Sequence, residues 1–159
     1  ALQEFLETNT TVQNQQCINN LTGKILRACV PTHTFGFPCR IDAIKNICDK
    51  YHIFLIEDAS ESLGTWYKTG KFANKHSGTI GNIGCLSFNG NKIITCGGGG
   101  MILTNNQILA NKAKYYSSQA KDDPIYFIHN DLSNFLNNFL AYFSFEKLKD
   151  LYPLPTLFL

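Results

Sequence analysis

The sequence predicts an α/β fold with a mostly parallel β-sheet flanked by helices, and three neighbouring segments support this prediction. Residues 25–30 form a short apolar run, residues 41–51 place apolar side chains at helical spacing, and residues 53–56 are continuously apolar. A strand, a helix and a strand within about thirty residues are typical of a βαβ unit, whose two strands run parallel. The run at 53–56 further indicates a strand that is covered on both faces.

The flanking elements are predicted in chain order. Residues 2–7 resemble the end of a helix, and residues 8–23 are polar and rich in Asn, Gln and Thr, which predicts a surface loop. Pro31 ends the first strand, which we expect to be buried. In the helix that follows, Asp42 lies in the first turn, where an acid suits the helix dipole, and His52 lies at the end.

The second half of the chain is predicted to hold fewer regular elements. Residues 64–84 indicate a long loop punctuated by glycines, followed by short strands at 85–88 and 99–104 and a helix at 107–116. Residues 132–143 show an apolar face at helical spacing, which predicts a packing helix, with a membrane or partner helix as the alternative. This stretch is shorter than the ~20 residues of a membrane span, so we expect no membrane segment.

Composition excludes several classes of function. The chain has 159 residues, 44% of them hydrophobic and 16% charged, which is enough to bury the core of one domain. Its formal net charge of +2 is too small to suggest a nucleic-acid partner. A basic patch is interpreted as a solvated loop, with anion binding as the alternative; it consists of Lys68, Lys71, Lys75 and His76. The polar start of the chain argues against a signal peptide, so we expect a cytoplasmic protein.

The six cysteines give no sign of a metal site or a disulfide framework. They are Cys17, Cys29, Cys39, Cys48, Cys85 and Cys96. No two of them have Cys-x-x-Cys spacing, and no histidine stands at zinc-ligand spacing from a cysteine pair. Most have apolar neighbours, so we interpret them as small buried hydrophobic residues in a reducing compartment.

Three polar side chains are predicted near the carboxyl ends of strands, where open α/β sheets bind ligands. Asp58 follows the apolar run at 53–56, Ser87 lies in the predicted strand at 85–88, and Lys92 comes shortly after it. A lysine can form an imine with the aldehyde of pyridoxal 5′-phosphate, and a carboxylate can keep the pyridine nitrogen protonated. A hydroxyl with nearby backbone N–H groups can hold the phosphate. The sequence therefore predicts a pyridoxal 5′-phosphate site.

Five segments, in order and spacing, resemble one known family. They are residues 30–36 (VPTHTFG), 41–44 (IDAI), 56–64 (IEDASESLG), 81–92 (GNIGCLSFNGNK) and 95–105 (TCGGGGMILTN). Over roughly residues 2–120 the chain is similar to the DegT/DnrJ/EryC1/StrS sugar aminotransferases, which are pyridoxal phosphate enzymes of fold type I. The resemblance implies that the chain is the central part of the large domain of such an enzyme.

The resemblance also implies residue roles and a reaction. Lys92 matches the catalytic lysine that binds the cofactor, and Asp58 matches the aspartate that pairs with the pyridine nitrogen. Ser87 matches a phosphate ligand, and Glu61 stands where the family has Gln or Glu beside the cofactor ring. The implied reaction transfers an amino group from an amino acid, usually glutamate, to a keto nucleotide-sugar in amino-sugar and surface-polysaccharide biosynthesis. The full-length enzyme is expected to be a homodimer.

The domain organisation is expected to be incomplete. Residues 1–123 are expected to form a partial cofactor-binding large domain, and residues 124–159 a diverged helical tail, with the small C-terminal domain of the family absent. The alternative to an enzyme is a truncated, non-catalytic remnant. A dinucleotide-binding domain is disfavoured, because the run at 97–100 lacks the fingerprint spacing.

Each site residue also has an ordinary interpretation when it is taken singly. Asp58 could cap a helix, and Lys92 could be a surface lysine. Glu57 and Glu61 could be surface charges.

Overall fold

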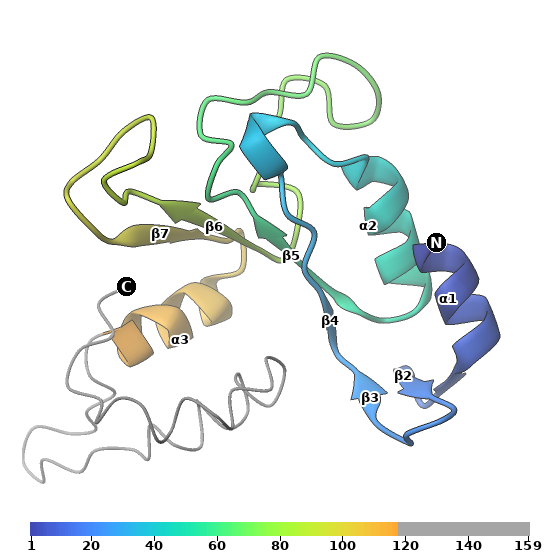
Figure 1. Ribbon diagram of the computed structural model, residues 1–159. Coiled ribbons are helices and arrows are strands. Elements are labelled where there is room, and N and C mark those ends of the chain that lie inside the picture. The colour runs from blue at the N-terminus through green and yellow to red at the C-terminus, as the bar shows by residue number, and fades with distance from the viewer. Residues whose placement is uncertain (118–159) are drawn as a thin grey trace, which may run out of the picture. The chain divides into compact units, whose positions relative to one another are not determined.

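The predicted α/β fold is confirmed in the computed structural model, which describes residues 1–117 of the chain. The strands of the main sheet are, in spatial order, β4 (Ala28–Cys29), β5 (Phe54–Asp58), β6 (Ile83–Ser87) and β7 (Gly100–Leu103) (Figure 1). The β4–β5 and β5–β6 pairs are parallel and the β6–β7 pair is antiparallel. Helix α2 (Ile41–Lys50) connects β4 to β5, which confirms the predicted βαβ unit.

The prediction of a surface loop over residues 8–23 is wrong, because this segment forms a β-hairpin. Strands β1 (Thr10–Gln13) and β2 (Gln16–Asn19) pair in antiparallel fashion around a two-residue turn. Asn14 and Gln15 in this turn have φ angles of 49° and 59°, the positive values that match the twist of a tight hairpin. Most side chains of the hairpin are polar and exposed, so its sequence lacks the apolar alternation that would have indicated strands.

The single buried strand expected over residues 25–30 is two short strands in different sheets. Strand β3 (Ile25–Leu26) pairs with β2 and completes a three-stranded antiparallel sheet, whereas β4 pairs with β5. The chain changes sheets at Arg27, whose carbonyl oxygen accepts a hydrogen bond of 2.8 Å from the Phe54 N–H. Both strands are half-buried, because neither lies in the middle of a sheet.

The core joins two helices to the start of β5. Helix α1 (Leu2–Asn9) confirms the helix predicted near the start of the chain, and α2 carries Asp42 in its first turn as predicted. The buried core residues are Leu6, Cys17, Ile41, Cys48, Tyr51, Ile53 and Leu55. Burial of these apolar side chains is the main force that holds the helices against the strand.

Strand β5 is buried on one face only in the described part of the chain, so the prediction that both faces are covered is wrong. Leu55 and Glu57 are buried, whereas Phe54, Ile56 and Asp58 are exposed or half-buried. This alternation follows from the two-residue period of a strand, which sends successive side chains to opposite faces.

The remaining predicted elements are confirmed where the structure describes them. Residues 59–82 contain no helix or named strand, β6 and β7 occupy the predicted positions, and α3 (Gln107–Ser117) is the predicted helix. Residues 1–106 form one compact unit, and α3 lies outside this unit and is described by itself. The helix predicted over 132–143 lies outside the described residues. No helix within residues 1–117 is long and apolar enough to cross a membrane.

All six cysteines are free thiols. Cys17 and Cys48 are buried in the core, as predicted, and three others are half-buried. Cys96 is exposed, so the prediction of burial is wrong for this residue. The reason is its position in the glycine-rich turn that precedes β7, where no apolar layer of the described chain covers it.

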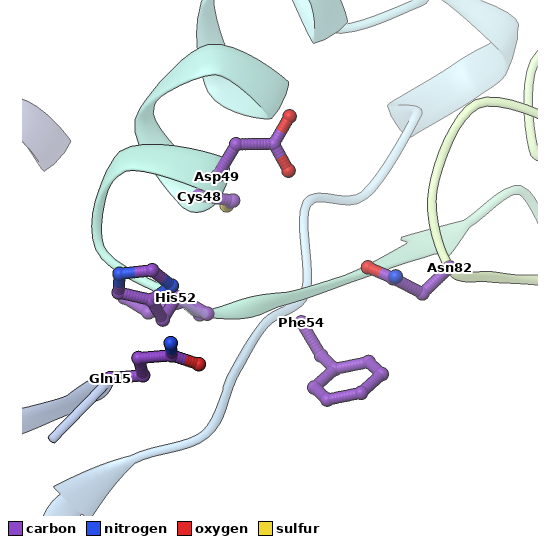
Figure 2. Close-up of a pocket in the computed structure, with 7 residues that line it drawn as sticks. Gln15, Cys48, Asp49, His52, Phe54 and Asn82 are labelled. Carbon is purple, nitrogen blue, oxygen red and sulfur yellow. The ribbon is translucent and has the colours of Figure 1, made fainter.

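A surface hollow of about 360 Å³ lies beside the start of β5 (Figure 2). It is lined by Gln15, Cys48, Asp49, His52, Ile53, Phe54 and Asn82. Asp58 is four residues further along the strand than Phe54, which corresponds to about 13 Å of extended chain. The hollow is therefore at the end of β5 opposite the predicted cofactor site, and it contains none of the predicted site residues.

Candidate active site

Asp58 is the last residue of β5, at the strand end where the sequence places it. Its carboxylate atom Oδ1 accepts hydrogen bonds from the Ser60 N–H at 3.1 Å and from the Ser60 hydroxyl at 2.6 Å. Within residues 1–117, atom Oδ2 accepts one longer hydrogen bond, of 3.4 Å, from the Thr32 hydroxyl. Residues 59–82 contain no helix for Asp58 to cap, so that alternative is wrong. The Asp58 carboxylate instead stabilises a local turn through the bonds of Oδ1 to Ser60, and Oδ2 keeps the longer and weaker bond to Thr32.

Ser87 ends the neighbouring strand at the same edge of the sheet. The parallel register pairs Asp58 with Cys85, so Ser87 lies two residues further along β6. Its hydroxyl oxygen accepts a hydrogen bond of 3.4 Å from the Asn89 N–H. In the antiparallel pair of β6 and β7, Ser87 lies opposite Gly100. A Cβ added at Gly100 would lie 2.5 Å from the Leu86 carbonyl oxygen. The last glycine of the run at 97–100 is therefore required by this close approach of β7.

Lys92 lies in the loop after β6, with its amine beside Glu61. Its Nζ is 3.8 Å from Glu61 Oε1, and the other carboxylate oxygen of Glu61 accepts a hydrogen bond of 2.8 Å from the Phe35 N–H. The Lys92 side chain is only 17% exposed, whereas Glu61 is 36% exposed. Lys92 is therefore better shielded than the neighbouring residues of its loop, which are exposed. A shielded amine next to a carboxylate can act as a nucleophile and can exchange a proton.

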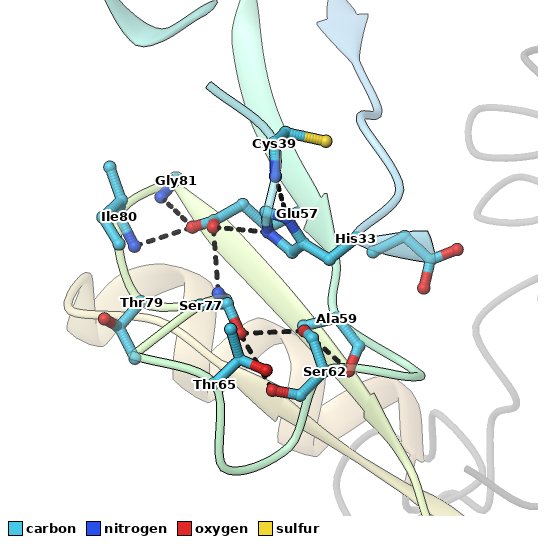
Figure 3. A network of polar contacts seen from close by, with 12 residues as sticks. His33, Cys39, Glu57, Ala59, Ser62, Thr65, Ser77, Thr79, Ile80 and Gly81 are labelled. Carbon is cyan, nitrogen blue, oxygen red and sulfur yellow. Dashed lines mark hydrogen bonds and ion pairs between the residues drawn. The ribbon is translucent and has the colours of Figure 1, made fainter. Parts of the chain in front are cut away.

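A buried polar network surrounds Glu57, the residue that precedes Asp58 in β5 (Figure 3). Glu57 is fully buried, so its interpretation as a surface charge is wrong. Its Oε2 accepts from His33 Nε2 and from the Gly78 N–H, each at 2.9 Å. Its Oε1 accepts from the N–H groups of Ile80 at 2.7 Å and Gly81 at 2.6 Å. Burial alone would raise the pKa of Glu57, but these hydrogen bonds outweigh burial and hold its pKa below the ordinary value.

Glu57 was not predicted as a buried residue, because residues 53–56 were interpreted as a uniformly apolar strand that ends before it. Extending the two-residue period of β5 from the buried Leu55 would have placed Glu57 on the buried face and Asp58 on the other. His33 lies in the segment 30–36 that resembles the family, but no local pattern assigned it a role, because its partner is 24 residues away along the chain.

The structure brings together some of the predicted site residues and not others. Glu61 and Lys92 are in contact, and Asp58 and Ser87 end neighbouring paired strands. Within residues 1–117, no hydrogen bond or ion pair joins Asp58 or Ser87 to Lys92. The same described part of the chain holds no cluster of three or more His, Cys, Asp or Glu side chains that could bind a metal ion.

Two proteins of similar sequence match between 60% and 75% of this chain. The chain is 41% identical over 121 residues to EpsN of Bacillus subtilis, a proposed pyridoxal phosphate-dependent aminotransferase, covering 75% of this chain and 30% of EpsN. It is 40% identical over 96 residues to the GDP-perosamine synthase of Caulobacter vibrioides, covering 60% of this chain and 24% of the synthase. The chain thus spans less than a third of the length of these relatives.

A solved structure and a family pattern agree with these relatives. The aminotransferase from Psychrobacter cryohalolentis matches with a TM-score of 0.54 and 37% identity, over 60% of this chain and 23% of that one. The sequence pattern of the DegT/DnrJ/EryC1/StrS aminotransferase family matches residues 7–151. This match covers most of the length of the chain, which therefore belongs to the DegT/DnrJ/EryC1/StrS aminotransferase family.

Proposed function

We propose that this chain supplies the cofactor-binding part of a pyridoxal 5′-phosphate-dependent aminotransferase that acts on a keto nucleotide-sugar. The observation that best supports the proposal is the shielded Lys92 amine beside Glu61, in the loop that follows the strand next to Asp58. The name of the relative from Caulobacter vibrioides contains a GDP-linked sugar, which supports a nucleotide-sugar substrate. An amino acid, with glutamate as the first candidate, would donate the amino group.

The chemistry of the site residues fits three polar groups of the cofactor, namely the pyridine nitrogen, the phosphate and the aldehyde. Asp58 Oδ2 is the lightly used oxygen, so it is the atom that would hold the pyridine nitrogen, while Ser60 keeps Oδ1 in place. The Ser87 hydroxyl would hold the phosphate, and Lys92 Nζ would bind the aldehyde carbon. When bound, pyridoxal 5′-phosphate supplies that aldehyde and a ring that stabilises negative charge on the substrate carbon.

Lys92 and Glu61 would handle the proton of the reaction. Lys92 Nζ would act first as the nucleophile and then, once free, as the base and acid that moves a proton at the substrate carbon. Glu61 would hold the ammonium form of Lys92, since its Oε1 is 3.8 Å from Nζ. The Phe35 N–H fixes the orientation of the Glu61 carboxylate, and the low exposure of Lys92 limits access of water to the amine.

Borohydride trapping tests the assignment of Lys92. The chain is mixed with pyridoxal 5′-phosphate, reduced, digested and mapped by mass spectrometry. We expect one phosphopyridoxyl group, on Lys92, in the unmodified chain and in a Lys68→Ala control, which changes an exposed loop lysine. The Lys92→Ala variant should lose this group. Labelling scattered over surface lysines and unchanged in Lys92→Ala would contradict the proposal and would favour the non-catalytic remnant.

A second measurement addresses the amino donor. The chain loaded with pyridoxal 5′-phosphate is incubated with L-glutamate, and 2-oxoglutarate and pyridoxamine phosphate are quantified together. Equal amounts of the two products, lost in Lys92→Ala, would support glutamate as the donor. A homodimeric full-length enzyme, a cytoplasmic location and a domain boundary near residue 123 stay predictions from the resemblance to the family.

A further inference from the structure

We propose that the buried His33–Glu57 pair is a positioning element that holds the Asp58 carboxylate in one orientation. The proposal rests on the proposed function, in which Asp58 binds the pyridine nitrogen. His33 and Glu57 are both 0% exposed, so neither side chain is open to a ligand at the surface. They would therefore act through Asp58 and not on the cofactor directly.

His33 forms hydrogen bonds to two successive residues of β5. Its side chain contacts Glu57 through Nε2, and its backbone N–H donates to the Asp58 carbonyl oxygen at 2.9 Å. The Asp58 N–H in turn donates to the Pro31 carbonyl oxygen at 2.9 Å. The segment around His33 thus continues the parallel pairing past β4 and fixes both peptide groups of Asp58.

The hydrogen bonds of the His33–Glu57 pair specify one tautomer of His33. The Cys39 N–H donates to His33 Nδ1 at 3.0 Å, so Nδ1 is an acceptor and the ring proton is on Nε2 (Figure 3). Nε2–H therefore donates to Glu57, and the other three partners of this carboxylate are backbone N–H groups. The other tautomer would place a hydrogen on Nδ1 against the Cys39 N–H and an acceptor at Nε2 against the Glu57 carboxylate, so the tautomer of His33 is determined.

Glu57 also constrains Ala59, the residue that follows Asp58, through the loop that contains Gly78. Glu57 accepts the N–H of Gly78, and a Cβ on Gly78 would lie 2.9 Å from the Ala59 Cβ. The loop fastened to Glu57 is therefore packed directly against Ala59, which is fully buried. The Ala59 N–H donates to the Cys85 carbonyl oxygen at 2.9 Å. One buried carboxylate thus constrains the backbone on both sides of Asp58.

The amide of Ser60 provides a readout that separates this role from a general contribution to stability. It donates to Asp58 Oδ1 at 3.1 Å, so its hydrogen exchange reports how well the carboxylate is held. If the pair only secures the loop of Gly78, Ile80 and Gly81, a variant would speed exchange at those amides and leave Ser60 unchanged. If the pair positions Asp58, exchange at Ser60 should rise as well.

Two variants of His33 test the proposal on the isotopically labelled chain. His33→Gln keeps an N–H donor near the position of Nε2, whereas His33→Asn keeps only an acceptor near Nδ1. We expect His33→Asn to raise hydrogen exchange at Ser60 by about tenfold, the effect of losing one charge-assisted hydrogen bond. His33→Gln should restore exchange close to that of the unmodified chain. Glu7→Gln, which changes an exposed acid on α1, is the control and should have no effect at Ser60.

Unchanged exchange at Ser60 in His33→Asn, with faster exchange at Gly81, would overturn the proposal. So would a nitrogen NMR spectrum of the unmodified chain that shows the proton of His33 on Nδ1, a measurement that remains decisive if both variants fail to fold. Failure of the proposed function would appear separately, as absence of the phosphopyridoxyl group on Lys92 in a chain whose Ser60 amide is protected.

Discussion

The candidate site has two halves, the acid half around Asp58 and the lysine half at residues 89–100, and the fold holds them in place in different ways. Glu57 and Ala59, on either side of Asp58, are fully buried. In the lysine half, residues 89–100 are exposed apart from Lys92, which is half-buried. This half is held largely by short-range bonds, such as those from the Lys92 N–H to the Asn89 carbonyl at 3.0 Å and from the Cys96 N–H to the Phe88 carbonyl at 3.1 Å.

The difference indicates that the fold itself positions the acid, while local turns position the lysine. Large apolar side chains follow Lys92 without cover in the described chain, since Ile93 and Ile94 are both exposed. The contact between Lys92 and Glu61 is the one ion pair of the described residues that joins the two halves.

Adding one methyl group should damage the acid half far more than the lysine half. At Gly84, in β6, a Cβ would lie 1.9 Å from the Gly78 carbonyl oxygen, so Gly84→Ala must displace backbone. We expect a loss of about 3 kcal/mol in the free energy of unfolding. At Gly90 nothing lies within 4 Å of the added Cβ, and Gly90→Ala should change stability by less than about 0.5 kcal/mol. Urea denaturation of both variants measures this, and equal losses would contradict the contrast.

Two glutamates that lie four residues apart should also differ. Glu57→Gln replaces an acceptor of four hydrogen bonds by an amide that cannot accept them all, and it should cost about 2 kcal/mol of stability at pH 7. Glu61→Gln keeps an oxygen for the Phe35 N–H and loses only a partly exposed ion pair, so it should cost less than about 1 kcal/mol. Thermal or urea unfolding measures both variants.

The effect of Glu57→Gln should depend on pH in a predictable direction. The pKa of Glu57 is lowered in the folded chain, because four hydrogen-bond donors outweigh the effect of burial. Its contribution to stability is therefore fully present above the ordinary value of 4.5 and is lost as pH falls through the lower folded-state value. The stability difference between the unmodified chain and Glu57→Gln should be constant from pH 7 to 5 and shrink below pH 4.5. A difference that grows in acid would contradict the assignment of Glu57 as a buried carboxylate.

The contrast also explains what the sequence could predict. The end of β5 was predictable because the apolar run at 53–56 stops shortly before Asp58, and the short strand predicted at 85–88 contains Ser87, the last residue of β6. Strand ends are where α/β sheets bind ligands. The buried network was not, because it depends on His33 meeting Glu57 across 24 residues of sequence, and no local pattern encodes that contact. The hairpin of β1 and β2 was missed for a related reason, since its strands are defined by pairing and not by an apolar face.

The smallest expected effect concerns backbone strain at the joint between the halves. Phe35, whose N–H holds Glu61, has a φ of 53°, a left-handed value that costs a non-glycine residue about 1–2 kcal/mol. Phe37 has an ordinary φ of −81°, and the two side chains are similarly exposed, at 81% and 78%. Phe35→Gly relieves strain, which offsets the extra freedom of glycine in the unfolded chain, whereas Phe37→Gly gains only that freedom.

We therefore expect Phe37→Gly to be less stable than Phe35→Gly by about 1 kcal/mol, measured by urea denaturation. The reverse order would show that the left-handed conformation at residue 35 is not strained in solution. The expected order would instead indicate that the chain accepts local strain to aim the Phe35 N–H at Glu61, the residue through which the acid half reaches Lys92. Strain at Phe35 would thus serve to orient Glu61, which links the half of the site that the core fixes to the half that the core does not fix.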